Sequence, residues 1–305
     1  MKSIIVVNPT KVDDLEGLRT TVAKACADAG WDAPTIIETT KDDPGEGMAK
    51  DAVSQGADLV FSAGGDGTVM AIAAGLAGSG VPMGILPMGT GNLLARNLEL
   101  PLTVPEAAIL ALTGVNRTID LATSVKNDED TKTVFAVMAG IGFDAAMMKD
   151  APEAVKAKLG WVAYLISGAK HLRDRSIRVG IKIDDKPPIT RHVKSVIVGN
   201  VGTLQGGLQL LPDADPEDGV LDVVVLQPTR VIDWLRVIGR LVTRAKREDS
   251  ELERFSGKKI ELQLRHHHPS QLDGDPQGDA VKMVLECVPA ALVVRVAGPG
   301  AGAKA

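Results

Sequence analysis

The sharpest chemical signal in the sequence is the run Gly64-Gly65-Asp66-Gly67-Thr68. Glycines let a backbone turn tightly and approach a ligand closely, and N–H groups at the start of a following helix can bind phosphate oxygens. A carboxylate among those N–H groups would repel phosphate. Asp66 therefore makes sense if it orders the loop, holds a hydroxyl or ribose, or recruits a divalent cation. A plain glycine-rich turn between a strand and a helix would have the same sequence.

A second glycine-rich loop, Pro87 to Asn92, also follows an apolar run and precedes a helix. In a parallel sheet the carboxyl ends of the strands meet at one edge, where ligands bind. Asn8, after the first apolar run, and Thr39-Thr40, after the second, fall at the same edge. Packing alone does not explain four polar loops at one edge, so we predict a ligand site there. Neither glycine-rich loop has the Walker A or the G-x-G-x-x-G pattern.

Two acidic segments later in the chain could also do chemistry. Asp213, Asp215, Glu217 and Asp218 offer the dense oxygen ligands that hard cations prefer, although an exposed acidic loop would look the same. Asp273-Gly274-Asp275 could supply a carboxylate base, which needs only hydrogen-bond reach to a hydroxyl. A solvated hairpin tip is the alternative reading, because Asp-Gly is a common turn pair.

The elements that must position these loops alternate between strand and helix in the first third of the chain. Apolar runs and helical spacing predict strands at 4–7, 35–37, 59–61 and 83–86, and helices at 15–29, 48–53, 69–76 and 103–112. The spacing of Thr103 and Glu106 is that of a capping box. Strand–helix alternation implies parallel pairing with right-handed crossovers, so we predict an α/β domain over 1–122.

The pattern changes near Leu121, and strands then dominate. We predict strands at 134–137, 177–183, 193–198, 221–226, 260–264 and 281–285, a hairpin turn at 184–188, and helices near 152–172 and 229–247. Residues 123–289 should therefore form a mostly antiparallel, β-rich domain of the sandwich type. A last apolar strand near 290–297 can return to the first domain, and 298–305 should be a flexible tail.

Composition limits the functional classes. The 305 residues are 45% hydrophobic and 24% charged, as in a soluble packed protein. With 3% aromatics and a net charge of −5, the chain has neither a base-stacking platform nor a basic field, so we expect no nucleic-acid partner. Cys26 and Cys287 form no C-x-x-C pair, and the N-terminus does not look like a signal peptide. We therefore expect a cytoplasmic protein.

Together these motifs resemble the diacylglycerol kinase catalytic-domain family, which includes bacterial soluble lipid kinases and the sphingosine and ceramide kinases. The resemblance rests on G-G-D-G-T followed by P-x-G-T-x-N, on Asn8-Pro9, on the segment 211–222 and on Leu272 to Asp275, and it extends across nearly the whole chain. The family is distantly related to NAD kinases and 6-phosphofructokinases. The resemblance implies an N-terminal parallel α/β domain of that type and a β-rich domain that receives a lipid.

The resemblance also implies ATP and Mg²⁺ as cofactors and assigns residue roles. Asp273 would be the general base for the acceptor hydroxyl, and Asp215, Asp218 and the carbonyl of Val220 would hold a structural Mg²⁺. The implied ATP-binding residues are Asn8, Thr40, Gly64, Gly65, Asp66, Gly67, Thr68, Val69, Met70, Gly89, Thr90 and Asn92. Phosphoryl transfer needs in-line positioning and neutralised phosphate charge more than covalent help, which suits such a set.

Two positions depart from the family pattern. Leu93 follows Asn92 where many members have an acidic residue, so a carboxylate contact to the catalytic metal is missing or comes from elsewhere, such as Asp120. Asp275 stands where glutamate is usual, so its reach is shorter. These departures keep open a catalytically inactive lipid- or nucleotide-binding regulator.

We therefore expect an ATP-dependent lipid kinase that phosphorylates a hydroxyl of a lipid such as diacylglycerol or a sphingoid base at a membrane surface. The alternatives are an NAD kinase and the inactive regulator. The basic predicted helix at 229–247 suits the inner face of a membrane, and a core-packed helix with a solvated face would look the same. The sequence is also compatible with a homodimer.

Overall fold

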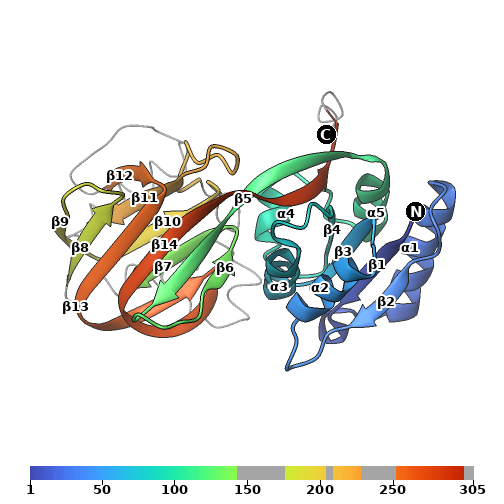
Figure 1. The fold of residues 1–305 in the computed structure, drawn as a ribbon, viewed down its shortest axis with the longest axis horizontal. Helices are drawn as coiled ribbons and strands as arrows, with labels where there is room; N and C mark the ends of the chain where they lie inside the picture. Colours follow the sequence, from blue (N-terminus) through green and yellow to red (C-terminus); the bar gives the residue numbers. More distant parts are fainter. Residues whose placement is uncertain (143–175, 204–208, 228–251, 299–305) are drawn as a thin grey trace. The chain divides into compact units, whose positions relative to one another are not determined.

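The computed structural model describes residues 1–142, 176–203, 209–227 and 252–298 (Figure 1). The chain divides into two compact units. The first contains residues 1–121 and the chain from Ala290 onward, and the second contains Ala122–Pro289. Two strands, β5 (Val115–Lys126) and β14 (Asp275–Val296), have residues in both units.

The first unit is built on a parallel sheet, as predicted. Its strands are β1 (Ser3–Val7), β2 (Thr35–Glu38), β3 (Leu59–Gly64) and β4 (Met83–Pro87). They lie in the order β4-β3-β1-β2, and the end of β14 runs parallel to β4, where Val294 pairs with Met83. The helical elements are η1 (Pro9–Lys11), α1 (Leu15–Asp28), α2 (Glu46–Ser54), α3 (Asp66–Leu76), α4 (Leu93–Asn97) and α5 (Val104–Thr113).

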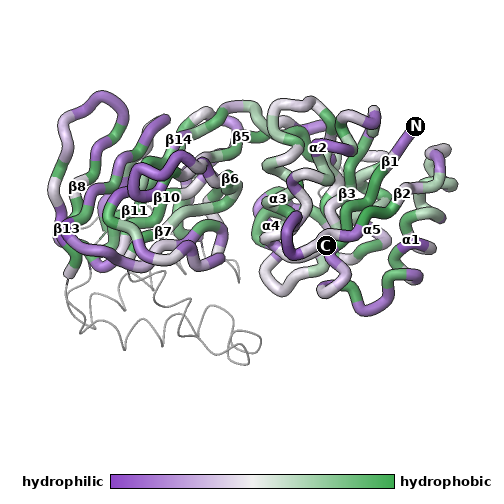
Figure 2. The backbone as a smooth tube through the Cα atoms, turned by 60° about the horizontal axis from the view of Figure 1, so that its bottom comes forward, coloured by the Kyte–Doolittle hydropathy of each residue, from purple (hydrophilic) through white to green (hydrophobic). Residues whose placement is uncertain are grey.

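Helices cover both faces of this sheet, which explains why its strands are apolar throughout. Ile5 and Phe61 pack in one cluster with residues of α1 and α5, including the buried Cys26. Val6 points to the opposite face, where Gly45 at the start of α2 lies close to Val6 and to Ile72 of α3. Figure 2 shows the hydrophobic course of β1 and β3.

The second unit is an antiparallel β-sandwich, again as predicted. Besides parts of β5 and β14, its strands are β6 (Thr133–Phe135), β7 (Met138–Gly142), β8 (Ile177–Ile183), β9 (Ile189–Val193), β10 (Ser195–Gly199), β11 (Leu221–Leu226), β12 (Leu252–Gly257) and β13 (Lys259–Leu272). One row of pairings runs β12-β11-β10-β7-β13, and β13 also pairs with β14 and with β8, which pairs with β9.

Strand β13 belongs to both layers of the sandwich. Its first half pairs with β8 through Leu264, and its last residues, 270–272, pair with β7. The ladder with β14 is irregular between Gln263 and His268, and bulges of this kind bend a strand. The turn after β13, which contains Asp273, lies at the start of β7, where the N–H of Asp273 donates to the carbonyl of Met138 at 2.7 Å.

Several strands differ from the sequence prediction. The predicted strands at 281–285 and 290–296 are parts of the single strand β14, and 134–137 spans β6 and the two residues before β7. Strands β5, β7, β9 and β12 were not predicted as separate elements. The predicted helices near 152–172 and 229–247, and residues 299–305 of the predicted tail, lie outside the described residues. Among the described helices, none has the length and apolar character needed to cross a bilayer.

Candidate functional site

Four polar loops meet at the carboxyl edge of the first unit's sheet. Backbone hydrogen bonds connect them: the N–H of Asn8 donates to the carbonyl of Ala63 at 2.8 Å, and the N–H of Met88 donates to that of Gly64 at 3.1 Å. On the other side of β1, the N–H of Thr39 donates to the carbonyl of Val7 at 2.8 Å. The structure thus brings together the loops that carry all of the predicted ATP-binding residues.

Asp66 ties the two glycine-rich loops together. Its Oδ1 accepts the N–H of Leu93 at 2.6 Å, and its Oδ2 accepts the N–H of Asn92 at 3.0 Å. The carboxylate of α3 thus satisfies backbone donors at the start of α4, which have no partner within their own helix. Burial raises the pKa of Asp66, while these two hydrogen bonds act in the opposite direction. Of the roles expected for Asp66, the geometry supports ordering of the loop.

Leu93 takes part in the same contact through its backbone. Many family members carry an acid at this position, and the sequence left open which group replaces it. Here the N–H of Leu93 makes the shorter of the two backbone hydrogen bonds to Asp66. The proposed substitute, Asp120, is buried, and its Oδ1 accepts the N–H of Ala290 at 2.7 Å.

The glycines of the second loop permit a very close approach to the first loop. A Cβ on Gly89 would lie 3.0 Å from the Cα of Gly65, and a Cβ on Gly91 would lie 2.5 Å from Oδ2 of Asp66. Asn92 has a φ of 48° and locks the loop, because its side chain both accepts from the N–H of Gly89 and donates to its carbonyl. The loop therefore has a fixed shape, with Thr90 exposed.

Asn8 and Thr68 are also engaged with each other. The Nδ2 of Asn8 donates to Oγ1 of Thr68 at 3.2 Å, and its Oδ1 accepts from the backbone and hydroxyl of Thr10. Further along α3, Val69 is buried and its N–H donates to the carbonyl of Gly65, while Met70 is half-buried and Gly67 is exposed. Gly67 is thus the most accessible of the predicted binding residues on α3.

Thr40 depends on a residue that the sequence reasoning missed. The Oγ1 of Thr40 accepts the N–H of Asp43 at 3.0 Å, and the carboxylate of Asp43 accepts the N–H groups of Gly45, Gly47 and Met48. Asp43 thus organises the turn that leads into α2. An acidic residue just before a predicted helix was the available signal.

In the second unit, Asp273 occupies a buried hairpin turn. Asp273 and Gly274 have φ values of 48° and 93°, and the flanking residues Leu272 and Asp275 pair, as in a two-residue turn after β13. Asp273 is only 7% exposed, so the solvated hairpin tip considered from the sequence is not what forms. Asp275 is exposed.

The carboxylate of Asp273 is held by three backbone donors. It accepts the N–H groups of Ala136 at 3.0 Å, Val137 at 2.9 Å and Met138 at 2.7 Å. These bonds occupy at least three of the roughly four acceptor positions of a carboxylate. The arrangement fixes the orientation of the carboxylate and stabilises its negative charge. No side-chain pattern could have revealed these partners, because they are main-chain groups.

The acidic loop before β11 folds through its own side chains. Oδ1 of Asp215 accepts the N–H of Glu217 at 3.1 Å, and Oδ1 of Asp218 accepts the N–H of Val220 at 3.0 Å. Burial and the charges of Asp218 and Asp213 raise the pKa of Asp222 to about 6. A cavity of about 250 Å³ lies beside the loop; its lining includes Leu211, Pro212, Asp213, Asp222, Arg254, Phe255 and Ser256.

Comparison with known protein families divides the chain in a similar way. Residues 2–124 match the diacylglycerol kinase catalytic domain. Residues 136–296 match the YegS C-terminal NAD kinase beta sandwich-like domain.

Curated relatives point in the same direction. A diacylglycerol kinase of Mycobacterium tuberculosis is 31% identical over 70% of this chain and 69% of its own length. A protein of Cronobacter sakazakii, named a probable lipid kinase YegS-like, is 30% identical over 96% of this chain and 95% of its own length. The chain spans 54% of the length of a third relative, an uncharacterized protein of Synechocystis to which it is 27% identical.

Solved structures share the fold. A diacylglycerol kinase from Bacillus anthracis superposes with a TM-score of 0.73 and 22% identity, covering 98% of this chain and 97% of that one. An NAD kinase from Archaeoglobus fulgidus, in complex with ATP, gives a TM-score of 0.54 and 12% identity over 97% and 93% of the two chains. At these identities the likeness concerns the fold.

Proposed function

This chain belongs to the diacylglycerol kinase catalytic-domain family, and we propose that it is an ATP-dependent lipid kinase. It transfers phosphate from ATP to a hydroxyl of a lipid such as diacylglycerol or a sphingoid base, presented at a membrane surface. Membership of a kinase family supports ATP as the phosphate donor. The finer assignment of the acceptor rests on the resemblance to lipid kinases of this family.

The observation that carries the proposal is the pair of hydrogen bonds that the backbone N–H groups of Asn92 and Leu93 donate to the carboxylate of Asp66. They fix two glycine-rich loops against each other at the carboxyl edge of a parallel sheet, where nucleotides commonly bind. A shape fixed in advance is what phosphoryl transfer requires, because its catalysis is mostly positioning and charge stabilisation. The first turn of α3, with Gly67 exposed, would present N–H groups to the phosphates.

The acceptor side of the reaction would use Asp273. Three backbone donors keep its carboxylate in one orientation, which suits a base that must meet a hydroxyl at hydrogen-bond distance. Phosphate transfer would need the acceptor hydroxyl to lie within hydrogen-bond reach of this carboxylate.

Mg²⁺ fits the acidic loop of the second unit. Burial, together with repulsion from Asp218 and Asp213, raises the pKa of Asp222, and a cation here would relieve the repulsive part. Asp215, Asp218 and the carbonyl of Val220 would hold it as a structural ion. In the part of the chain that the structure describes, no three His, Cys, Asp or Glu side chains form a metal-binding group, so backbone and water oxygens would complete the shell.

The test is a phosphate-transfer assay with radiolabelled ATP and the purified chain. Diacylglycerol and sphingosine are presented in neutral detergent micelles, and NAD is offered in a parallel reaction. We expect label in a lipid product and none in NAD. Label in NAD would identify an NAD kinase, and ATP binding without turnover on any lipid would identify a regulator; either result would overturn the proposal.

A further inference from the structure

An exposed sheet face of the second unit carries lysine side chains at one end and arginine side chains at the other. The side chains of Ile177, Val179, Ile181 and Ile183 on β8 point into the sandwich core. Because side chains alternate along a strand, Arg178 and Lys182 point the other way. We call the outward side of β9, β8, β13 and β14 the outer sheet face.

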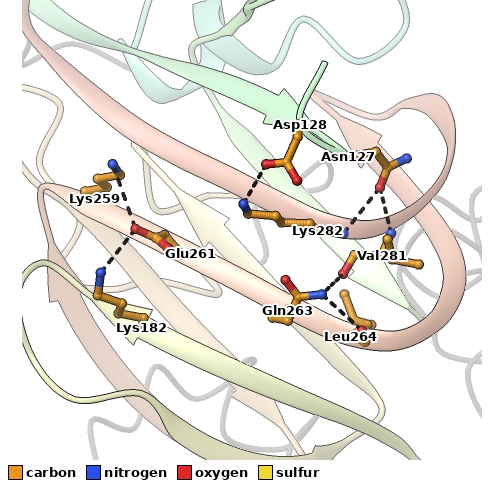
Figure 3. A network of polar contacts seen from close by, with 9 residues as sticks. All are labelled: Asn127, Asp128, Lys182, Lys259, Glu261, Gln263, Leu264, Val281 and Lys282. Atoms are coloured by element: carbon orange, nitrogen blue, oxygen red, sulfur yellow. Dashed lines mark hydrogen bonds and ion pairs between the residues drawn. The ribbon is translucent and has the colours of Figure 1, made fainter. Parts of the chain in front are cut away.

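At one end of the outer sheet face, lysines are matched by acids (Figure 3). Glu261 lies 3.4 Å from the Nζ of Lys182 and 3.8 Å from that of Lys259. Lys282 pairs with Asp128, and Asn127 accepts the backbone N–H groups of Val281 and Lys282. The lysines at this end thus lie in a local network.

At the other end, two arginines lie side by side. Leu264 on β13 pairs with Val179 on β8, so the antiparallel register brings Arg265 next to Arg178. Arg178 itself pairs with His192 on β9. All three side chains are exposed, as are His266 and His267, which follow Arg265 where β13 leaves its regular pairing with β14.

This cationic end is costly for the isolated protein. Like charges directly opposite each other on neighbouring strands destabilise a sheet. Among the described residues, neither Arg178 nor Arg265 lies within ion-pair distance of an acid, in contrast to Lys182, Lys259 and Lys282. A partner that brings negative charge would turn the repulsion into attraction.

We propose that the cationic end of the outer sheet face, made of Arg178, His192, Arg265, His266 and His267, docks on an anionic lipid surface. The charges are spread over an open, exposed sheet face rather than gathered in a cavity, which matches an extended array of headgroup phosphates. The choice of a membrane over another polyanion rests on the proposed function, because the acceptor of a lipid kinase lies in a bilayer.

Vesicle sedimentation with the full chain tests the docking surface. One set of vesicles contains equal parts of phosphatidylglycerol and phosphatidylcholine, and the other contains phosphatidylcholine alone. We expect binding to the anionic vesicles that weakens with salt. Each arginine near such a surface is expected to contribute about fivefold in affinity, so Arg178→Gln with Arg265→Gln should weaken binding about thirtyfold.

The matched control is Lys24→Gln with Lys41→Gln, which removes the same charge from exposed positions of the first unit. We expect its vesicle affinity to stay near that of the parent. Thermal melts of both double variants check that they fold, and the single Arg265→Gln variant should show about a fivefold loss.

Two results would overturn the docking surface: equal vesicle binding by the arginine variant and the parent, or equal parental binding to the two vesicle types. Tighter parental binding to duplex DNA than to anionic vesicles would assign the surface to another polyanion and also overturn it. Activity on lipid in neutral detergent micelles should survive the arginine substitutions. Failure of that activity in the parent would count against the kinase and leave the vesicle result intact, so the two proposals fail separately.

Discussion

At the scale of single residues, two aspartates, Asp66 and the buried Asp273, have comparable roles in the two units. Each carboxylate collects backbone N–H groups from a neighbouring segment: Asp66 those of Asn92 and Leu93, and Asp273 those of residues 136–138. Backbone donors hold a carboxylate without supplying a positive charge. Both side chains therefore position a loop and at the same time keep a negative charge near the candidate chemistry.

Removing the carboxylate of Asp66 should separate the two glycine-rich loops. Asp66→Ala leaves two backbone donors without their acceptor, which should cost about 1–3 kcal/mol of unfolding free energy. ATP binding, measured by calorimetry, should be lost. Asp14→Ala is the matched control: it removes the cap of α1, which accepts the N–H of Gly17, and should lower stability without changing ATP affinity. Unchanged ATP binding by Asp66→Ala would place the nucleotide elsewhere.

Asp273→Asn should lower kcat on a lipid by about 10²–10⁴-fold if Asp273 is the general base. The N–H groups of Ala136, Val137 and Met138 are donors, so an amide nitrogen in place of one carboxylate oxygen would face a donor, and the turn should loosen as well.

Gln271→Ala controls for this loosening. It removes the side-chain acceptor of the Gly274 N–H in the same turn but keeps the carboxylate, so kcat should fall much less. ATP affinity should barely change in either variant. Near-parental turnover by Asp273→Asn would contradict the assignment of the base.

At the scale of elements, the sequence predicted those helices and strands in which apolar residues recur at regular spacing. The helices from α1 to α5 and the strands from β1 to β4 follow their apolar spacing. Thr103 does precede α5, but its hydroxyl donates to the carboxylate of Glu106 at 2.6 Å instead of capping a backbone N–H.

The missed strands have a physical explanation. Strands β9 and β12 are short and carry Arg191 and Glu253, and β7 contains Gly140 and Gly142. Short runs interrupted by charged residues, and runs that contain glycine, give a weak strand signal in the sequence, and tertiary pairing decides their state. The structure joins the predicted strands at 281–285 and 290–296 into the single strand β14, in which Ala290 has a φ of 50°.

Arg191 of β9 and Glu253 of β12 form an ion pair between strands that do not pair with each other in the described part of the sheet. Nε of Arg191 lies 2.9 Å from Oε1 of Glu253, and Gln227 donates to the same oxygen at 2.7 Å. The hydrogen bond from Arg191 lowers the pKa of Glu253 from its ordinary value.

A lowered pKa in the folded state means that this stabilisation is present above the unfolded pKa and is lost as the pH falls through the folded pKa. Glu253→Gln should therefore lower the melting temperature at pH 7, by the equivalent of less than about 1 kcal/mol for a partly exposed pair. Parent and variant should converge in acid. Melting curves from pH 7 down to pH 3 measure this, and a gap that widens in acid would contradict the sign.

At the scale of the whole molecule, the fold class, the parallel order of the first unit and the sandwich of the second could be predicted from the sequence. The edge where the polar loops gather could be predicted as well, since it follows from strand direction alone. The hydrogen-bond partners of Asp273 could not be predicted, because every non-proline residue has a backbone N–H group and the sequence does not show which ones lie near the carboxylate.

Metal binding should be visible as a change in global stability. An ion held only by the native state stabilises it by mass action, by about 2.7 kcal/mol at a hundred times its Kd. The melting temperature should rise with Mg²⁺ in the parent and stop responding in Asp218→Ala. Asp185→Ala, which removes an exposed acid from another turn, is the control and should respond like the parent. A parental melting temperature independent of Mg²⁺ would exclude the ion.

The course of β14 has a consequence for biosynthesis. The strand starts beside the turn of Asp273 and ends against β4, so the first unit is built from two distant stretches of chain. On the ribosome, residues 1–121 emerge long before Val294 can take its place beside Met83. The nascent α/β unit thus waits with one side of β4 uncovered while the whole sandwich is being synthesised, and unpaired strand edges are prone to misassociation. Completion of the first unit is therefore a late event, coupled to the folding of the second.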